Sequence, residues 1–131
     1  MTYLSYWGAV TVARWEVEFY RSLGENPVAE ELRSLSKKDI ELATEVVQDL
    51  KDLHVFGLAL LEKRLHKVRG TDLSELRTLW QHRIARSLFF EAGGRLLVVT
   101  TIFQKKGNEI PAAAKKRALA RMDRWRKERG I

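Results

Sequence analysis

The sequence predicts a small α+β fold, in which helices pack on a small, largely antiparallel sheet in the order β-α-α-β-β-β-α. Three observations predict this class: an alternating strand-like stretch near the start, two segments of helical spacing after it, and three apolar runs with short turns before a basic helix-like end. A length of 131 residues suits one domain, and no repeat or low-complexity linker interrupts it. We therefore expect a single domain over residues 1–131, with residues 1–14 as an N-terminal extension.

The first half of the chain predicts one strand and two helices. In "ARWEVEFY", Trp15, Val17 and Phe19 alternate with glutamates, as in a half-buried strand. Asn26 followed by Pro27 is typical of a helix start, and this helix is expected to end near Leu35. The next helix is expected to begin after Ser36 as its cap and to stop at Gly57.

The second half predicts three strands and a last helix. The strands are expected at about Leu73–Trp80, Ile84–Phe90 and Leu96–Gln104, with "AGG" at 92–94 turning the last pair into a hairpin. Several of their positions are apolar in succession, which predicts that both faces of the sheet are covered. The final helix is expected to begin at Pro111, with one apolar face and cations over much of the rest.

Charge is distributed unevenly along the chain. Residues 1–62 carry 6 Lys and Arg against 11 Asp and Glu, a net charge of −5, whereas residues 63–131 carry 18 against 6, a net charge of +12. A basic half of this kind favours a polyanionic partner, because bound phosphates release their counterions. Nucleic acid is therefore the leading partner class, and the alternative is a basic helix that is merely solvated.

Composition also limits the compartment and the cofactors. The chain has no cysteine, which excludes disulfides and thiolate metal sites, and its apolar runs are too short to span a bilayer. The N-terminus lacks the features of a signal peptide, so we expect a cytoplasmic protein without membrane contact. The sequence contains no phosphate-binding glycine loop, zinc-binding pair or nucleophile elbow, and we expect no cofactor and no metal.

A series of motifs resembles a known family. "WEVEFY", "NPVAEELRSL", "KVRGTDLSELR" and "RSLFFEAGGRLLVVTTIFQKK", followed by Pro111 and the basic helix, are similar in order and spacing to the RelE/HigB-like toxins of bacterial type II toxin-antitoxin systems, in particular their phage-derived Gp49-like branch. The resemblance covers Trp15 to Trp125. Two positions depart from it: Phe89 replaces a common tyrosine, and Ile110 replaces a common threonine.

This resemblance implies a RelE-like microbial ribonuclease fold and a metal-independent endoribonuclease. Such a toxin cleaves messenger RNA, usually on the ribosome, and thereby inhibits translation. It also implies a cognate helix-turn-helix antitoxin of the HigA-like kind, held with the toxin in a hetero-oligomer. Two alternatives remain: a non-catalytic nucleic-acid-binding module, and a phage-derived structural or interaction protein.

Metal-free cleavage sets the chemical demands on the site. The ribose 2′-hydroxyl attacks the adjacent phosphorus, so a group must accept its proton, cations must stabilise the phosphorane, and a donor must protonate the leaving 5′-oxygen. In the resembled fold, Arg77, Arg86, Lys105 and Lys106 converge from three neighbouring strands as the bottom of a phosphate pocket. Alternatively, Arg86 pairs with Glu75 or Glu91, and Arg77 with a carboxylate, for structural reasons.

Three histidines are candidates for the proton acceptor, because arginine stays protonated. His82, in the "WQHR" turn, is assigned a catalytic role together with Arg77, Arg86 and Lys106; His66 lies in the basic run "KRLHKVRG", and His54 is expected to pack at a helix end. A lysine beside other cations is an equal rival. The residues assigned to RNA binding are Lys63, Arg64, Lys67, Arg69, Arg83 and Lys105.

Overall fold

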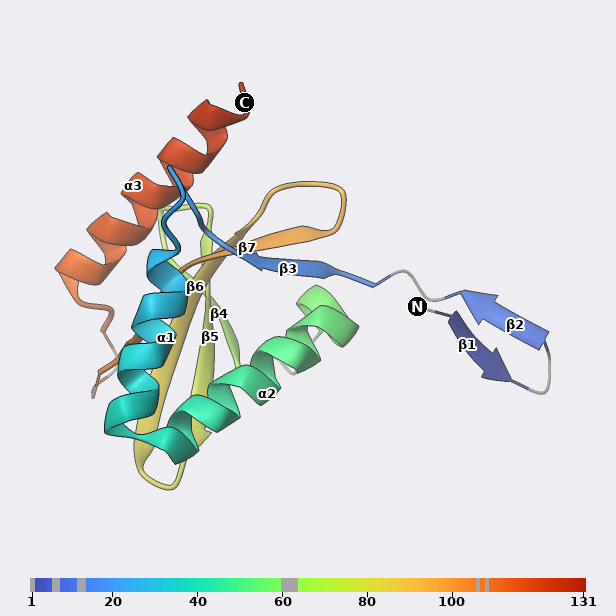
Figure 1. Cartoon of the computed structure of the whole chain (residues 1–131), viewed down its shortest axis with the longest axis horizontal. Helices are drawn as coiled ribbons and strands as arrows, with labels where there is room; N and C mark the ends of the chain where they lie inside the picture. The colour runs from blue at the N-terminus through green and yellow to red at the C-terminus, as the bar shows by residue number, and fades with distance from the viewer. Residues whose placement is uncertain (1, 6–7, 12–13, 60–63, 106, 108) are drawn as a thin grey trace.

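The computed structural model describes residues 2–5, 8–11, 14–59, 64–105, 107 and 109–131, with the backbone alone for 2–5 and 8–11 (Figure 1). Its elements are β1 (Thr2–Ser5), β2 (Gly8–Thr11), β3 (Glu16–Phe19), α1 (Pro27–Lys38), α2 (Ile40–Phe56), a short 3-10 helix (Gly57–Ala59), β4 (Leu65–Lys67), β5 (Leu73–Trp80), β6 (Arg83–Glu91), β7 (Leu96–Gln104) and α3 (Ala112–Glu128).

The main sheet has five strands in the order β3-β7-β6-β5-β4. Strands β4 to β7 form an antiparallel meander, whereas β3 lies parallel to β7. The predicted α+β class and all seven predicted elements are confirmed. The described residues add three features that were not predicted: the separate hairpin β1–β2, the short 3-10 helix, and the short strand β4 inside the basic run.

The two faces of the sheet carry different helices. Val17 and Phe19 of β3 line a groove with residues of α1 and α2, and we call this side of the sheet the α1–α2 face. On the opposite side, Phe90 meets Trp125 of α3 edge-on, at 5.4 Å between ring centroids. This side is the α3 face. Both faces are thus covered at least in part, as the long apolar strands predict.

Polar residues fix the ends of the first two helices. Asn26 caps α1 as predicted, since its side chain accepts a hydrogen bond from the Ala29 amide at 3.2 Å. The predicted cap of the second helix, Ser36, is wrong because α1 continues through that position to Lys38. Asp39 caps α2 instead and accepts from the Leu42 amide at 3.2 Å.

The end of α2 is tied to the beginning of β3. The Trp15 amide donates to the His54 carbonyl at 3.2 Å, and the Trp15 ring lies against Gly57. A Cβ at Gly57 would stand 1.9 Å from Nε1 of Trp15, so only glycine fits there. Gly57 also has φ of +57°, which favours glycine. Among the described residues, no helix is long and apolar enough to cross a bilayer.

Candidate functional site

Two of the predicted catalytic arginines meet on the α3 face. Arg77 of β5 and Arg86 of β6 are directly paired across the antiparallel ladder, so their side chains leave the sheet on the same side. Glu75 pairs with Leu88, and Leu73 with Phe90, which contacts Trp125 of α3. Because side chains alternate along a strand, this register places Glu75, Arg77 and Arg86 on the α3 face.

The buried carboxylate of Glu75 holds both arginines. Its Oε2 accepts from Nη1 of Arg86 at 2.7 Å, and its Oε1 accepts from Nε of Arg77. Nη2 of Arg86 donates to the Gly107 carbonyl. The side chains of Glu75 and Arg86 are each 1% exposed, whereas that of Arg77 is 30% exposed. The two arginines and the glutamate between them form one cluster, which runs from the buried Arg86 to the partly exposed Arg77. We call it the Arg–Glu–Arg cluster.

This geometry corrects the role predicted for Arg86. Its guanidinium is buried and already hydrogen-bonded to Glu75 and Gly107, so it does not form the floor of an open phosphate pocket. The structural alternative, pairing with Glu75, is the arrangement observed. Arg77 is the member of the cluster that reaches the surface. Since Glu75 neutralises only one of the two cations, the cluster keeps a net positive charge beside an exposed arginine.

The α3 face is open beyond this cluster. Leu79, two residues after Arg77 on β5, lies on the same face and is 62% exposed. An apolar side chain with that exposure shows that nothing in the described part of the chain covers the face near the β5–β6 turn. A ligand can therefore approach Arg77 from this side.

His66, rather than His82, lies beside the cluster. His66 is half-buried on β4 and is paired directly with Glu75, so its ring shares the α3 face with the two arginines. His82 is exposed in the two-residue turn between β5 and β6. It lies four residues from Arg86 along the strand and turn, or about 13 Å at 3.3 Å per strand residue. The catalytic role predicted for His82 stays a prediction.

His66 was one of three candidate histidines in the sequence, but its place opposite Glu75 could not be predicted, because β4 was not predicted. A three-residue strand inside a basic run gives almost no alternation to detect. Had "LHK" been paired with β5, the register would have placed His66 opposite Glu75.

Two residues predicted to bind RNA are tied to carboxylates of the α2 region. Arg64 donates to Asp49 at 2.8 Å and to Asp52 at 3.4 Å. Arg83 donates to Asp39 and lies 3.8 Å from Glu41. These ion pairs connect the sheet to the α2 region. The RNA contacts predicted for the two arginines stay predictions, because the structure does not test them.

The two ion pairs affect their carboxyl groups differently. The hydrogen bond from Arg83 lowers the pKa of Asp39, and Asp39 in turn raises the pKa of Arg83. For Asp49, burial is the largest influence and raises the pKa, although Arg64 acts in the opposite direction. Arg83 therefore favours the charged form of Asp39, whereas burial disfavours the charged form of Asp49.

The remaining predicted cations have different positions. Lys67, Arg69 and Lys105 are exposed, at the end of β4, in the β4–β5 turn and just after β7. They remain available to a polyanion, although the structure does not test that role. Lys63 and Lys106 lie outside the described residues.

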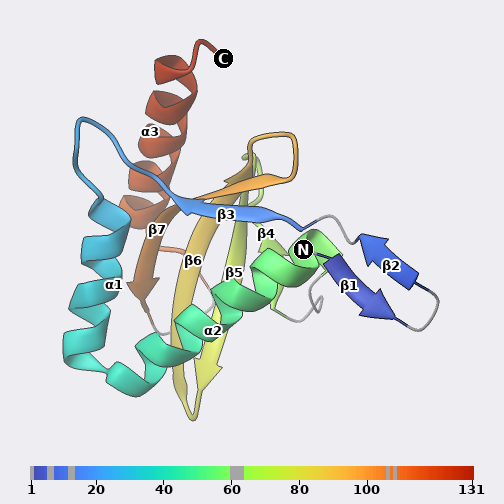
Figure 2. The same ribbon diagram turned by 45° about the vertical axis from the view of Figure 1, so that its right-hand side comes forward.

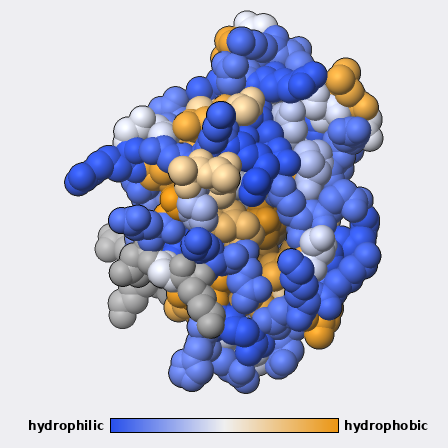
Figure 3. Space-filling model, turned by 90° about the vertical axis from the view of Figure 1, so that its left-hand side faces the viewer, coloured by the Kyte–Doolittle hydropathy of each residue, from blue (hydrophilic) through white to orange (hydrophobic). Residues whose placement is uncertain are grey.

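The largest groove among those described lies elsewhere, between α1 and the end of β7. It has a volume of about 610 Å³, and Lys105 lines it, but Arg77 and Arg86 do not. Figure 3 views the side on which α1 and α3 lie, where an apolar patch appears among mostly hydrophilic side chains. We regard this groove as separate from the arginine cluster because its lining combines acidic, basic and apolar residues without a concentration of cations.

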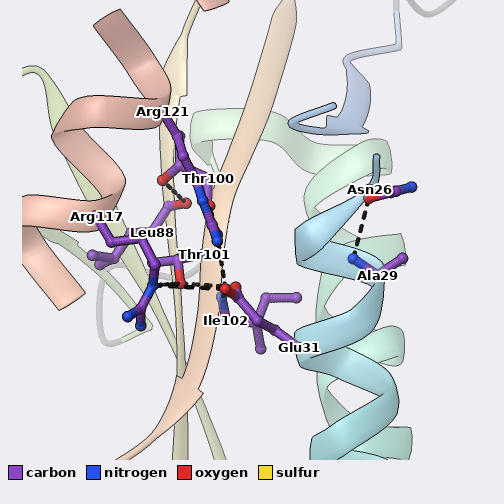
Figure 4. A network of polar contacts seen from close by, with 9 residues as sticks. All are labelled: Asn26, Ala29, Glu31, Leu88, Thr100, Thr101, Ile102, Arg117 and Arg121. Carbon is purple, nitrogen blue, oxygen red and sulfur yellow. Dashed lines mark hydrogen bonds and ion pairs between the residues drawn. The ribbon is translucent and has the colours of Figure 1, made fainter. Parts of the chain in front are cut away.

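Glu31 of α1 forms a network beside this groove that sequence reasoning missed (Figure 4). Its carboxylate accepts from the Thr101 hydroxyl at 2.8 Å, the Ile102 amide at 3.0 Å and Nη1 of Arg121 at 2.8 Å. The same Nη1 donates to the Thr100 carbonyl at 2.8 Å. Because β3 pairs with β7 only as far as Val99, these side chains satisfy backbone groups at the unpaired end of β7.

Within the described part of the chain, no cluster of three or more histidine and carboxylate side chains could hold a metal ion. The groups that the α3 face offers for chemistry are a partly exposed guanidinium, a histidine and a buried ion pair. Such a set can bind and stabilise a phosphate anion and exchange a proton with its surroundings.

Comparison with known proteins gives the family. No curated protein matches the chain. Residues 30–123 match the family model described as "Phage derived protein Gp49-like (DUF891)", which covers more than half of the chain, from α1 into α3 and including the Arg–Glu–Arg cluster. This chain therefore belongs to the phage-derived Gp49-like family, a toxin-like family.

Proposed function

We propose that this protein is a RelE/HigB-like toxin of a type II toxin-antitoxin system. It cleaves messenger RNA on the ribosome as a metal-independent endoribonuclease and thereby inhibits translation. The observation that carries the proposal is the exposed guanidinium of Arg77, held on the open α3 face by the buried Glu75–Arg86 pair with His66 on the neighbouring strand. Membership of a toxin-like family supports it.

In this proposal, Arg77 binds the scissile phosphate. Its guanidinium presents a planar set of donors that matches two phosphate oxygens, and Glu75 uses only Nε. The terminal nitrogens then face the phosphate. As the 2′-oxygen attacks phosphorus, negative charge grows on the non-bridging oxygens, and a guanidinium already fixed in place stabilises that charge without reorganising.

His66 accepts the proton of the 2′-hydroxyl. Histidine is the side chain best suited to exchange a proton near neutral pH, and the register opposite Glu75 places it on the same face as Arg77. Attack forms a 2′,3′-cyclic phosphate and breaks the bond from phosphorus to the 5′-oxygen of the next nucleotide. That oxygen takes a proton from solvent water and leaves as a 5′-hydroxyl, and His66 returns its proton to solvent. Arg86 acts as a positioning residue, because it fixes Glu75 and touches no substrate.

The cognate partner is a HigA-like helix-turn-helix antitoxin that neutralises the toxin in a hetero-oligomer. Neutralisation requires competition with RNA or exclusion from the ribosome. The exposed cations Lys67, Arg69 and Lys105 favour a partner surface rich in carboxylates, because such charges steer and orient association. Expression of the chain alone should arrest bacterial growth, and co-expression of the antitoxin should relieve the arrest.

Mapping of RNA ends on translating ribosomes tests the enzymatic proposal. Purified protein incubated with programmed ribosomes should generate new messenger RNA 5′-ends that carry hydroxyl groups, with cyclic phosphate on the upstream fragments. An intact message, recovered from ribosomes to which folded protein has bound, would instead identify a non-catalytic binding module. An intact message without any ribosome or RNA binding would favour a phage-derived structural or interaction protein.

A non-catalytic nucleic-acid-binding module is the second candidate. The helix α3 favours it, because cations lie along most of the helix and several reach solvent, including Lys116, Arg124 and Lys127. Such a surface supports polyanion binding without any chemistry. The arrangement of Arg77 and His66 on one face is the reason for preferring the enzyme.

A further inference from the structure

Among the described residues, no strand pairs with the outer edge of β3, which we call the open edge. Strand β3 is the outermost strand of the main sheet, with β7 on one side. Backbone amides of Glu16 and Tyr20 donate to carbonyls on the β7 side, at 2.8 and 2.9 Å. Because alternate residues of a strand direct their backbone groups to opposite sides, the amides and carbonyls of Val17 and Phe19 point away from β7. They form a short template for another strand.

An apolar groove lies beside this open edge. Val17 and Phe19 line it together with Leu32, Val47 and Leu50, and its volume is about 350 Å³. Val47 also lines a neighbouring groove of about 310 Å³ with Ile40, and these two side chains are 38% and 63% exposed. A strand that paired with β3 would therefore have an apolar surface for its side chains on the α1–α2 face.

The N-terminal hairpin is a pair of strands to which no further strand is added within the part of the chain that the structure describes. Strands β1 and β2, "TYLS" and "GAVT", pair with each other and form a separate two-stranded sheet. Figures 1 and 2 both show this hairpin standing apart from the main sheet, beyond the beginning of β3. An isolated hairpin is marginal in water and needs a third strand or an apolar surface. Each of its strands has four residues, as β3 does.

The hairpin cannot easily use the open edge of its own chain. For β2 to pair with β3 of the same chain, the chain would have to reverse direction between Thr11 and Glu16. The residues on either side of that turn would then have to form the first hydrogen bonds between the two strands. The Trp15 amide, which lies on the open side, is already bonded to the His54 carbonyl, and its ring is fixed against Gly57. The position where such a turn would begin is thus occupied by the end of α2.

We propose that two copies of this chain form a dimer by exchanging their N-terminal hairpins. The hairpin of each copy pairs with Val17 and Phe19 of β3 in the other and covers the apolar groove there. The exchange is reciprocal, so the assembly closes at two copies with the same contact made twice. The dimer surface lies on the α1–α2 face and leaves Arg77 on the opposite face free. The inference is independent of the proposed ribonuclease activity.

Sedimentation of the full chain tests the dimer. Wild-type protein should sediment as a dimer at micromolar concentrations. Val10→Pro places a residue without an amide donor in β2, and it should give a monomer that remains folded. Val47→Asp places a charge in the groove, and it should weaken dimerisation at least about tenfold. Leu79→Asp is the matched control, because Leu79 is a more exposed apolar residue on the other face and its variant should dimerise normally.

Crosslinking identifies the contact. The natural chain has no cysteine, so one batch with Ala9→Cys and another with Lys51→Cys can be mixed and treated with a short bismaleimide. Lys51 lines the groove, and the mixed pair should crosslink efficiently. Gln81→Cys, in the exposed turn between β5 and β6, replaces Lys51→Cys as the control and should not crosslink. A monomeric wild type, a dimer unaffected by Val10→Pro, or equal crosslinking to Lys51→Cys and Gln81→Cys would each overturn the proposal.

Discussion

At the scale of single residues, burial separates two arginines that the sequence treats alike. Arg86 is fully buried against Glu75, whereas Arg77 binds the same carboxylate and still reaches solvent. The sequence showed that both could lie on one face, since their strands form a hairpin. It could not show which would be covered, because the cover includes the Gly107 carbonyl from the segment after β7.

Arg86→Ala should destabilise the fold strongly, which differs from the expectation that an active-site cation can be removed without structural cost. The change leaves the Glu75 carboxylate buried with only Arg77 as a partner. Removing one member of a buried ion pair typically costs about 3–5 kcal/mol. Arg77→Ala should cost clearly less, because its side chain is partly exposed. Chemical denaturation measures both, and equal small losses would show that the Arg86–Glu75 pair contributes little.

Asp39→Asn and Asp49→Asn should change the pH dependence of stability in opposite directions. Arg83 lowers the pKa of Asp39 in the folded state. The charged Asp39 side chain therefore stabilises the fold at pH values above its unfolded pKa, roughly 4, and this stabilisation is lost as the pH falls through the lower folded pKa. The folded pKa of Asp49 is raised by burial, so its ionisation reduces stability as the pH rises above roughly 4.

Relative to wild type, the unfolding free energy of Asp39→Asn should therefore fall as the pH rises from acid conditions toward 4. That of Asp49→Asn should rise as the pH increases above 4 toward neutrality. Denaturation at several pH values measures both differences. Slopes of the same sign for the two variants would contradict the assignment of hydrogen bonding to Asp39 and burial to Asp49.

At the scale of secondary-structure elements, helices α1 and α3 are joined across the unpaired end of β7 by Glu31. The sequence predicted both helices and the strand, because amphipathic spacing and apolar runs are local signals. The role of Glu31 depends on three elements far apart in the chain, and in the sequence it looks the same as its neighbour Glu30. The parallel pairing of β3 with β7 was hidden for the same reason, since each strand's own pattern does not reveal its partner.

Glu31→Ala should lower the free energy of unfolding by roughly 2–3 kcal/mol, because it leaves the Ile102 amide and Arg121 without their acceptor. Glu30→Ala is the matched control, since its side chain is 67% exposed and forms a surface ion pair with Arg33. Such pairs contribute little, so this variant should stay within about 0.5 kcal/mol of wild type. Thermal or chemical unfolding of the two variants compares them, and similar losses would argue against the network.

At the scale of the whole molecule, the residues proposed for catalysis lie on one side of the sheet. An unpaired strand edge and an apolar groove lie toward the other side. The uneven charge distribution was visible in the sequence and agrees with exposed cations around the α3 face. The sequence did not show that two of the nine predicted cations, Arg64 and Arg83, would pair with carboxylates from the acidic half.

Cleavage, in this account, should persist in EDTA, because the described residues offer no set of metal ligands and the proposed chemistry uses protein cations. The test uses a messenger RNA fragment bound to the ribosome. The ribosomes must stay intact while divalent ions are chelated selectively or replaced by polyamines. Loss of cleavage on chelation with restoration by Mg²⁺ or Mn²⁺, while RNA binding is unchanged, would reject the metal-independent mechanism.

Single-turnover cleavage of ribosome-bound message by Arg77→Ala tests the central claim most directly. Loss of one fixed donor to a developing oxyanion costs on the order of a hundred- to a thousandfold in rate, so the variant should be slowed at least about a hundredfold. Lys115→Ala removes equal charge from the start of α3, and it should remain within roughly threefold of wild type. Thermal midpoints must show both variants folded. Equal cleavage by the two variants would contradict the assignment of Arg77 as the phosphate-binding residue.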